Sequence, residues 1–184
     1  MSLNYLAEHE RIPFQNYPYE WSAEMLFAAA ELTLDLHEKL LGEGFGLKDA
    51  TPYNVLFRGP KPVFVDWLSF EKRDPLDHVW LPQAQFLRTF VLPLLVNKEF
   101  GVPLSQIFQT NRDGIEPEQV YAMAGAFKRL TSPFLTLVTL PKMLGGGKQS
   151  SNHRASSTSQ GIGGWFSARI SSMSAAGSSP RPCS

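Results

Sequence analysis

The sequence contains one cysteine among its 184 residues, Cys183, close to the C-terminal end. One thiol has no partner within the chain, which excludes an intramolecular disulfide. A long apolar run is also missing. The longest stretch, residues 86–96, is interrupted by Arg88 and Pro93, whereas a membrane-spanning helix needs about 20 apolar residues. The first residues lack the continuous apolar segment of a secretory signal. We therefore expect a cytoplasmic protein without a membrane span.

An excess of charge of either sign is missing too. Seventeen basic and seventeen acidic residues give a formal net charge of +0. No overall electric field favours nucleic acid or an anionic membrane, so we expect neither as a partner. The hydrophobic content of 43% at this length suffices for one core but not for two full domains. One domain with additional segments is the expected organisation.

The composition changes abruptly after residue 144. Residues 145–184 contain no Asp or Glu and are rich in Ser and Gly. Such a segment buries too little apolar surface to offset the entropy of ordering it, so we predict a disordered tail. The glycines at 161–164 follow no strand and indicate a linker rather than a nucleotide-binding loop. We predict an extended N-terminal segment over 1–21 and a folded domain over 22–144.

Three segments have the spacing of apolar residues that is typical of helices. The first begins after Ser22, a suitable N-cap, and ends near Gly42. The second covers residues 80–97, where Pro93 is expected to kink or divide it. The third begins near Pro117, after a turn over residues 111–114. Prolines leave the state of residues 132–144 open.

The most informative stretch is Leu47 to Phe70, LKDATPYNVLFRGPKPVFVDWLSF. Two short runs of β-branched and aromatic residues, 55–57 and 63–66, flank a Gly59-Pro60 turn, a pattern that predicts a β-hairpin. With the helical segments around it, the chain is expected to be an α+β domain, mostly helical, built around this one short hairpin.

Three polar residues, Asp49, Asn54 and Asp66, lie around the predicted hairpin. Asn54 precedes the first strand and Asp66 ends the second, so both lie at the same end and can converge on one metal ion. Mg²⁺ prefers such oxygen ligands, and phosphoryl transfer also needs a carboxylate near the acceptor hydroxyl, which Asp49 is placed to supply. The alternative is that these side chains only stabilise tight turns.

The segment Asp49 to Asn54 resembles the D-x-x-x-x-N catalytic loop of the protein-kinase-like superfamily, which includes aminoglycoside phosphotransferases. Asp66-Trp67-Leu68 resembles its DFG element. The chain from Pro18 to Leu144 is also similar to bacterial proteins described as SAM-dependent methyltransferases, in which a kinase-like segment precedes the methyltransferase domain. The resemblance implies a kinase-like C-lobe, with Asp49 as catalytic base and Lys48 contacting phosphate. It further implies Asn54 and Asp66 as ligands of Mg²⁺, with ATP as the nucleotide.

The chain departs from these families in two ways. Only 48 residues precede Asp49, without a glycine-rich phosphate loop, so the N-lobe is largely absent. No SAM-binding strand and glycine loop follows Leu144, so SAM is expected only in a missing domain. The resemblance therefore implies a transferase-related, kinase-like module that is not a complete catalyst by itself. Two alternatives stay open: a non-catalytic module that docks on a methyltransferase or on itself through residues 86–96, and a fragment of a protein whose missing C-terminal domain transfers methyl groups.

The remaining candidate residues are interpreted as structural. His37 is expected to be a packing or surface residue, and a proline-rich loop without supporting partners argues against a metal site at Asp74, Asp77 and His78. Core packing is the simplest interpretation of three aromatic residues, Trp67, Phe70 and Trp80.

Overall fold

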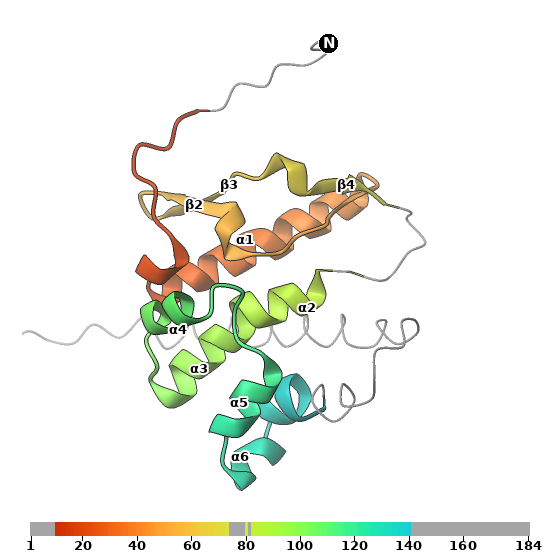
Figure 1. Cartoon of the computed structure of the whole chain (residues 1–184). Coiled ribbons are helices and arrows are strands. Elements are labelled where there is room, and N and C mark those ends of the chain that lie inside the picture. Colours follow the sequence, from red (N-terminus) through yellow and green to blue (C-terminus); the bar gives the residue numbers. More distant parts are fainter. Residues whose placement is uncertain (1–9, 74–79, 81, 141–184) are drawn as a thin grey trace, which may run out of the picture.

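The computed structural model describes residues 10–73, 80 and 82–140 (Figure 1). The fold is α+β and mostly helical, with two small antiparallel sheets, which confirms the predicted class. In Figure 1 the strands lie along α1, and most of the remaining helices lie on the other side of α1. The predicted tail, Cys183 and the 74–78 loop lie outside the described residues. No helix in the described part is long and apolar enough to cross a membrane.

Helix α1 (Ala23–Gly42) is the predicted first helix. The hydroxyl of Ser22 accepts a hydrogen bond from the Met25 backbone N–H, the N-cap that the sequence predicts. Its buried residues recur every three or four positions and form one face: Leu26, Ala29, Ala30, Thr33 and His37. Short helix η1 (Pro18–Glu20) precedes it and packs on α4 (Leu104–Thr110).

The predicted hairpin is present. Strand β2 (Val55–Arg58) pairs antiparallel with β3 (Lys61–Phe64), and Arg58 lies opposite Lys61. The loop is therefore Gly59-Pro60. Gly59 has a φ of 58°, and proline fixes a negative φ after it, the combination that a type II′ hairpin turn requires.

A second sheet was not predicted, so the expectation of a single hairpin is wrong. Strand β1 (Phe45–Leu47) pairs antiparallel with β4 (Phe70–Lys72), with Leu47 opposite Phe70. Strand β1 precedes the β2–β3 hairpin in the sequence and β4 follows it, so the paired strands β1 and β4 enclose the hairpin. Each strand is only three residues long and its partner is distant in sequence, so neither a turn signal nor an alternating pattern marks it.

The second predicted helical segment is continuous rather than two helices joined at a bend. Helix α2 (Gln83–Phe86), the π-helical turn η4 (Leu87–Val91) and α3 (Leu92–Phe100) follow one another directly. Pro93 lies in the first turn of α3. Its ring would clash with the carbonyl four residues earlier in a regular α-helix, and the wider π turn just before it relieves that conflict.

Three helical segments complete the described chain: α5 (Pro117–Met123), α6 (Ala126–Leu130) and the π-helical turn η5 (Leu135–Thr139). The helix predicted to begin near Pro117 is confirmed, although it stops at Met123. The turn over 111–114 is confirmed as well, because the Gly114 N–H donates to the Asn111 carbonyl.

Both halves of the chain contribute to one core. Its largest fully buried side chains come from α1, β1, β2 and the later helices: Leu26, Leu47, Val55, Phe86, Phe90, Leu92 and Phe134. Trp80 packs against this core, as expected. Trp67 does not, since it is 60% exposed and contacts Phe70 at the surface. The expectation that Trp67 is a core residue is therefore wrong, because the helical turn after β3 directs it outward.

Candidate functional site

Asn54 and Asp66 are brought together by a residue that was not predicted from the sequence, Ser69. The Asn54 side-chain amide donates to the Ser69 hydroxyl at 3.0 Å, and that hydroxyl donates to Asp66 Oδ2 at 2.6 Å. Ser69 is fully buried and Asn54 nearly so. We call these three residues the polar triad. Asn54 and Asp66 therefore both bond to one side chain, Ser69, and their convergence on a metal ion stays a prediction.

Asp66 also stabilises the start of the helical turn that follows it. It is the N-cap of the short helix η3 (Trp67–Ser69), and its Oδ1 accepts from the Leu68 N–H at 3.0 Å. Both carboxylate oxygens therefore accept a hydrogen bond. Because an ionised carboxylate has about four acceptor positions, each oxygen keeps a lone pair for a further partner.

The backbone of Lys48, which precedes Asp49, lies next to the backbone of Ser69, a member of the polar triad. The Lys48 N–H donates to the Ser69 carbonyl at 2.9 Å, extending the β1–β4 pairing by one bond. Lys48 is exposed and Asp49 is half-buried. Within the described part of the chain, no hydrogen bond joins the Asp49 carboxylate to Asn54 or Asp66. The structure thus places Asp49 in the neighbouring segment without linking it to the triad.

The loop that carries Asp49 is anchored to the helices. The Ala50 N–H donates to Gln85 Oε1 at 2.7 Å, and the Thr89 hydroxyl lies 3.2 Å from the Ala50 carbonyl and 2.8 Å from the Gln85 carbonyl. Neither helical residue was predicted from the sequence. Their four-residue spacing places them on one helix face, but that spacing does not identify the loop they hold.

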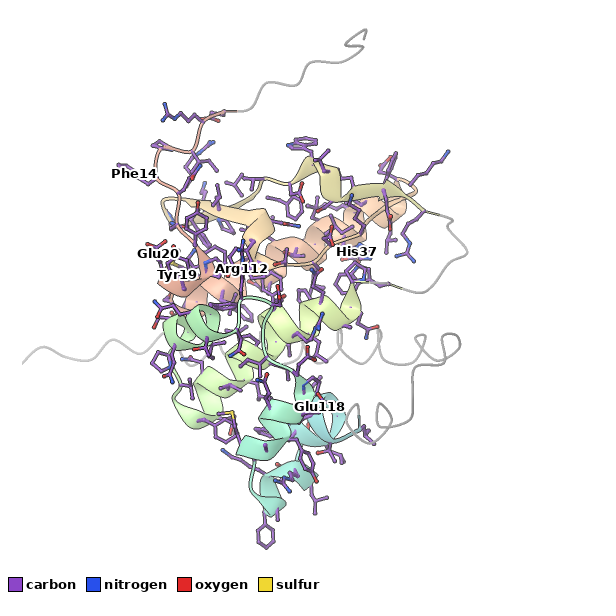
Figure 2. All side chains as sticks on the ribbon, viewed as in Figure 1. Phe14, Tyr19, Glu20, His37, Arg112 and Glu118 are labelled. Atoms are coloured by element: carbon purple, nitrogen blue, oxygen red, sulfur yellow. The ribbon has the colours of Figure 1, made fainter. Side chains whose placement is uncertain are left out.

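His37 lies at the far end of α1 from Tyr19 and Arg112 (Figure 2). Its Nδ1 accepts from the Leu47 N–H at 3.2 Å, and its ring stacks on Trp80 with 4.7 Å between centroids. Burial lowers the pKa of His37 to about 4, and the nearby Arg73 charge contributes in the same direction. The imidazole is therefore neutral at pH 7 and acts as a buried acceptor, in agreement with the packing role expected for it.

The residues present would supply an incomplete set of metal ligands. Among residues 10–73, 80 and 82–140 no group of three or more His, Cys, Asp or Glu side chains could hold a metal ion. Asn54 and Asp66 offer one amide and one carboxylate. Mg²⁺ commonly binds through one or two protein ligands and completes its shell with water and substrate phosphate, so this donor set fits Mg²⁺ bound together with a phosphate better than a closed metal site.

Comparison with known proteins gives one informative match. The chain is 38% identical over 115 residues to a protein described as nodulation protein NoeA from Rhizobium meliloti (strain 1021). The match covers 62% of this chain and 24% of that protein. No family model matches the sequence, and no solved structure matches it. The chain is thus similar to about a quarter of a longer bacterial protein.

Proposed function

We propose that the chain is a kinase-like module of a longer, methyltransferase-associated bacterial protein, and that Asn54 and Asp66 bind Mg²⁺ together with the phosphates of a nucleotide such as ATP. The observation that carries the proposal is the polar triad, which holds an amide and a carboxylate together at the end of a hairpin. Methyl transfer is assigned to a separate SAM-binding domain.

Each residue would have a limited role. Asp66 supplies the charged ligand and Asn54 a neutral one, while Ser69 orients the carboxylate through its hydroxyl. Lys48, whose side chain is exposed, would contact a bound phosphate, and Asp49 would be the base for an acceptor hydroxyl. We propose binding without phosphoryl transfer by this chain alone, since catalysis also requires groups that cradle the phosphates.

The test compares wild type with Asp66→Asn. The amide keeps the size of the side chain and an oxygen that can accept from the Leu68 N–H, but it removes the negative charge that a divalent cation needs. We expect affinity for the preformed Mn²⁺–ATP complex, measured by isothermal titration calorimetry, to fall about tenfold or more. Asp35→Asn, on the exposed face of α1, is the control and should bind as wild type does.

The site assignment would be wrong if Asp66→Asn bound Mn²⁺ and ATP as tightly as wild type. It would be equally wrong if Asp35→Asn lost the same affinity, because the effect would then reflect net charge. Unchanged far-UV circular dichroism of both variants ensures that the comparison concerns folded protein.

The second candidate is a non-catalytic interaction module. It is favoured by the same hydrogen bonds, because capping η3 and bonding Ser69 account for Asp66 without any ligand. The docking segment expected from the sequence, residues 86–96, is wrong for this role, because its apolar side chains, among them Phe90 and Leu92, are buried in the core. The exposed side chains of Trp67 and Leu68, which follow Asp66 directly, would take its place. In that case Asp66→Ala lowers the free energy of unfolding by about 1–2 kcal/mol in urea denaturation, no ATP binding is detected in wild type, and the wild-type chain self-associates in sedimentation velocity.

A further inference from the structure

A cavity lies outside the polar triad. Its volume is about 520 Å³, within the range of small-molecule sites. Three separate parts of the chain line it: the N-terminal segment, the short helix η2 (Pro52–Asn54) and the end of α4 with the turn after it. The lining residues are Tyr17, Tyr19, Tyr53, Phe108, Gln109 and Arg112. Figure 2 shows Tyr19 and Arg112 on the same side of the molecule.

Arg112 is the positively charged residue among those that line this cavity. Its guanidinium carbon lies 5.2 Å from the centroid of the Tyr53 ring, a cation–π arrangement. Arg112 is exposed, and in the described part of the chain no carboxylate forms an ion pair with it. The guanidinium is therefore held near the Tyr53 ring by the cation–π interaction, while charge-assisted hydrogen bonds remain available to an incoming anion.

Aromatic rings provide most of the remaining surface. Tyr17 and Tyr19 stack on each other, with 5.9 Å between centroids and 19° between planes, and 39% and 37% of their surfaces are exposed. Phe108, a buried residue of α4, also lines the cavity. Burial raises the pKa of Tyr53; the Arg112 charge acts in the opposite direction with a smaller effect, and the Asp113 charge raises the pKa further, so the phenol stays neutral at pH 7.

We infer that this cavity binds a planar aromatic ring that carries an anionic group, with the ring against the tyrosines and the anion on Arg112. Tyr rings and an arginine plane offer flat faces that suit an aromatic ligand. The anion would gain from Arg112 and the ring from the tyrosines, so a ligand that carries both should bind more tightly than one that carries only one of them. A nucleoside monophosphate and a simple aromatic carboxylate share this chemistry.

The inference does not depend on the proposed Mg²⁺ site. None of the lining residues belongs to the polar triad, although Tyr53 precedes Asn54 in sequence. Binding can therefore be measured in EDTA, where any metal-dependent interaction at Asn54 and Asp66 is absent. Failure of one proposal leaves the other standing.

The experiment is isothermal titration calorimetry of the full chain in EDTA with four probes: AMP, 4-hydroxybenzoate, adenosine and inorganic phosphate. We expect AMP or 4-hydroxybenzoate to bind about tenfold or more tightly than adenosine and phosphate, because only these two carry both the ring and the anion. Tighter binding of AMP identifies a nucleotide ligand, and tighter binding of 4-hydroxybenzoate identifies an aryl acid.

Two variants locate the binding. Arg112→Gln and Tyr19→Ala should each weaken the preferred probe about tenfold or more. The matched control is Arg129→Gln: the Arg129 guanidinium lies 4.0 Å from the centroid of Tyr121, so it forms a similar pair, but neither residue lines the cavity. It should bind the probe as wild type does.

Three results would overturn the inference. The first is equal affinity for AMP, adenosine and phosphate, or no binding of any probe at millimolar concentration. The second is undiminished binding by both folded variants, Arg112→Gln and Tyr19→Ala. The third is an equal loss in Arg129→Gln, which would mean that arginine removal acts through the overall charge.

Discussion

At the residue scale, burial decides roles that the residue type leaves undetermined. His37 could be a ligand, a surface residue or a packing residue, and its burial against Trp80 makes it a neutral acceptor for the Leu47 N–H. Protonation would remove that acceptor and place a charge beside Arg73. The same imidazole therefore links the end of α1 to β1 only while it is uncharged.

This arrangement predicts a dependence of stability on pH. The pKa of His37 is about 4 in the folded protein, against 6.5 for a freely solvated imidazole such as that of the unfolded chain. Between these values the unfolded chain binds a proton that the folded protein does not, so stability falls as pH falls from 6.5 to 4 and is fully present above 6.5. We expect a loss of up to about 3 kcal/mol from this residue, measured by urea denaturation at several pH values.

The variant His37→Gln isolates the contribution. Its amide oxygen supplies an acceptor but does not titrate, so the difference in stability from wild type should shrink as pH falls toward 4. A difference that stays constant across this range would contradict the assignment to His37.

Gly114 gives a second prediction at this scale. It has a φ of 87°, and a Cβ there would collide with the backbone carbonyl of Arg88. Gly114→Ala should therefore lower the free energy of unfolding by roughly 2 kcal/mol or more. Gly42→Ala is the control, since a Cβ at that helical position meets nothing within 4 Å, and it should be neutral or slightly stabilising. Equal losses in thermal denaturation would contradict this account.

At the element scale, the π turn η4 both accommodates Pro93 and holds the Asp49 loop. Thr89 within it donates its hydroxyl toward the carbonyls of Ala50 and Gln85. A regular α-helix here would change which side chains face the loop, because a π turn shifts the register of the following residues. The π turn therefore helps to hold the loop that carries Asp49 in its position.

We expect Thr89→Val to destabilise the protein by about 1–2 kcal/mol, because it leaves the buried Ala50 carbonyl without that donor while keeping the side-chain shape. Hydrogen exchange of the Ala50 amide should become faster. Thr110→Val is the control: its hydroxyl bonds only the Gln106 carbonyl, four residues earlier and exposed. Unchanged exchange at Ala50 would show that Thr89 does not hold the loop.

The sequence predicts the elements whose signals are local. The N-cap at Ser22, the apolar spacing of α1 and the Gly59-Pro60 turn each depend on residues that are close together in the sequence. The structure contains all three features. The β1–β4 pair depends on partners that are distant in sequence and was not predicted. The π turn lies beside Pro93 and the end of α5 lies beside Gly125, residues that mark an irregularity without specifying its form. The site follows the same rule: hairpin geometry brings Asn54 and Asp66 together, and Ser69 lies only three residues after the capping Asp66, a local signal that could have identified it. Gln85 joins through a contact 35 residues away along the chain that no local pattern specifies.

At the scale of the whole molecule, the buried core extends only from Trp21 to Val138 within the described residues. It includes side chains from the last helical turn, among them Phe134 and Val138. The predicted boundary near residue 144 therefore has a direct test.

Removing residues 145–184 should leave the midpoint of thermal unfolding unchanged, because their composition offers little apolar surface to bury. Ending the chain after Ser132 should lower the midpoint by roughly 10 °C or more, since it removes Phe134 and Val138 from the core. Differential scanning calorimetry of the three chains makes the comparison. A lower midpoint for the 1–144 chain would contradict the predicted boundary.

The enclosure of one hairpin by a second strand pair also predicts an order of folding. The β2–β3 hairpin closes a two-residue loop, with Arg58 opposite Lys61, and hairpins form within about 1–10 μs. Strands β1 and β4 must bring Leu47 and Phe70 together across the whole intervening segment, at a larger entropic cost. Once the hairpin has formed it shortens that distance. Asn54 is therefore placed early, and the buried serine that joins it to Asp66 is enclosed when the outer strands meet.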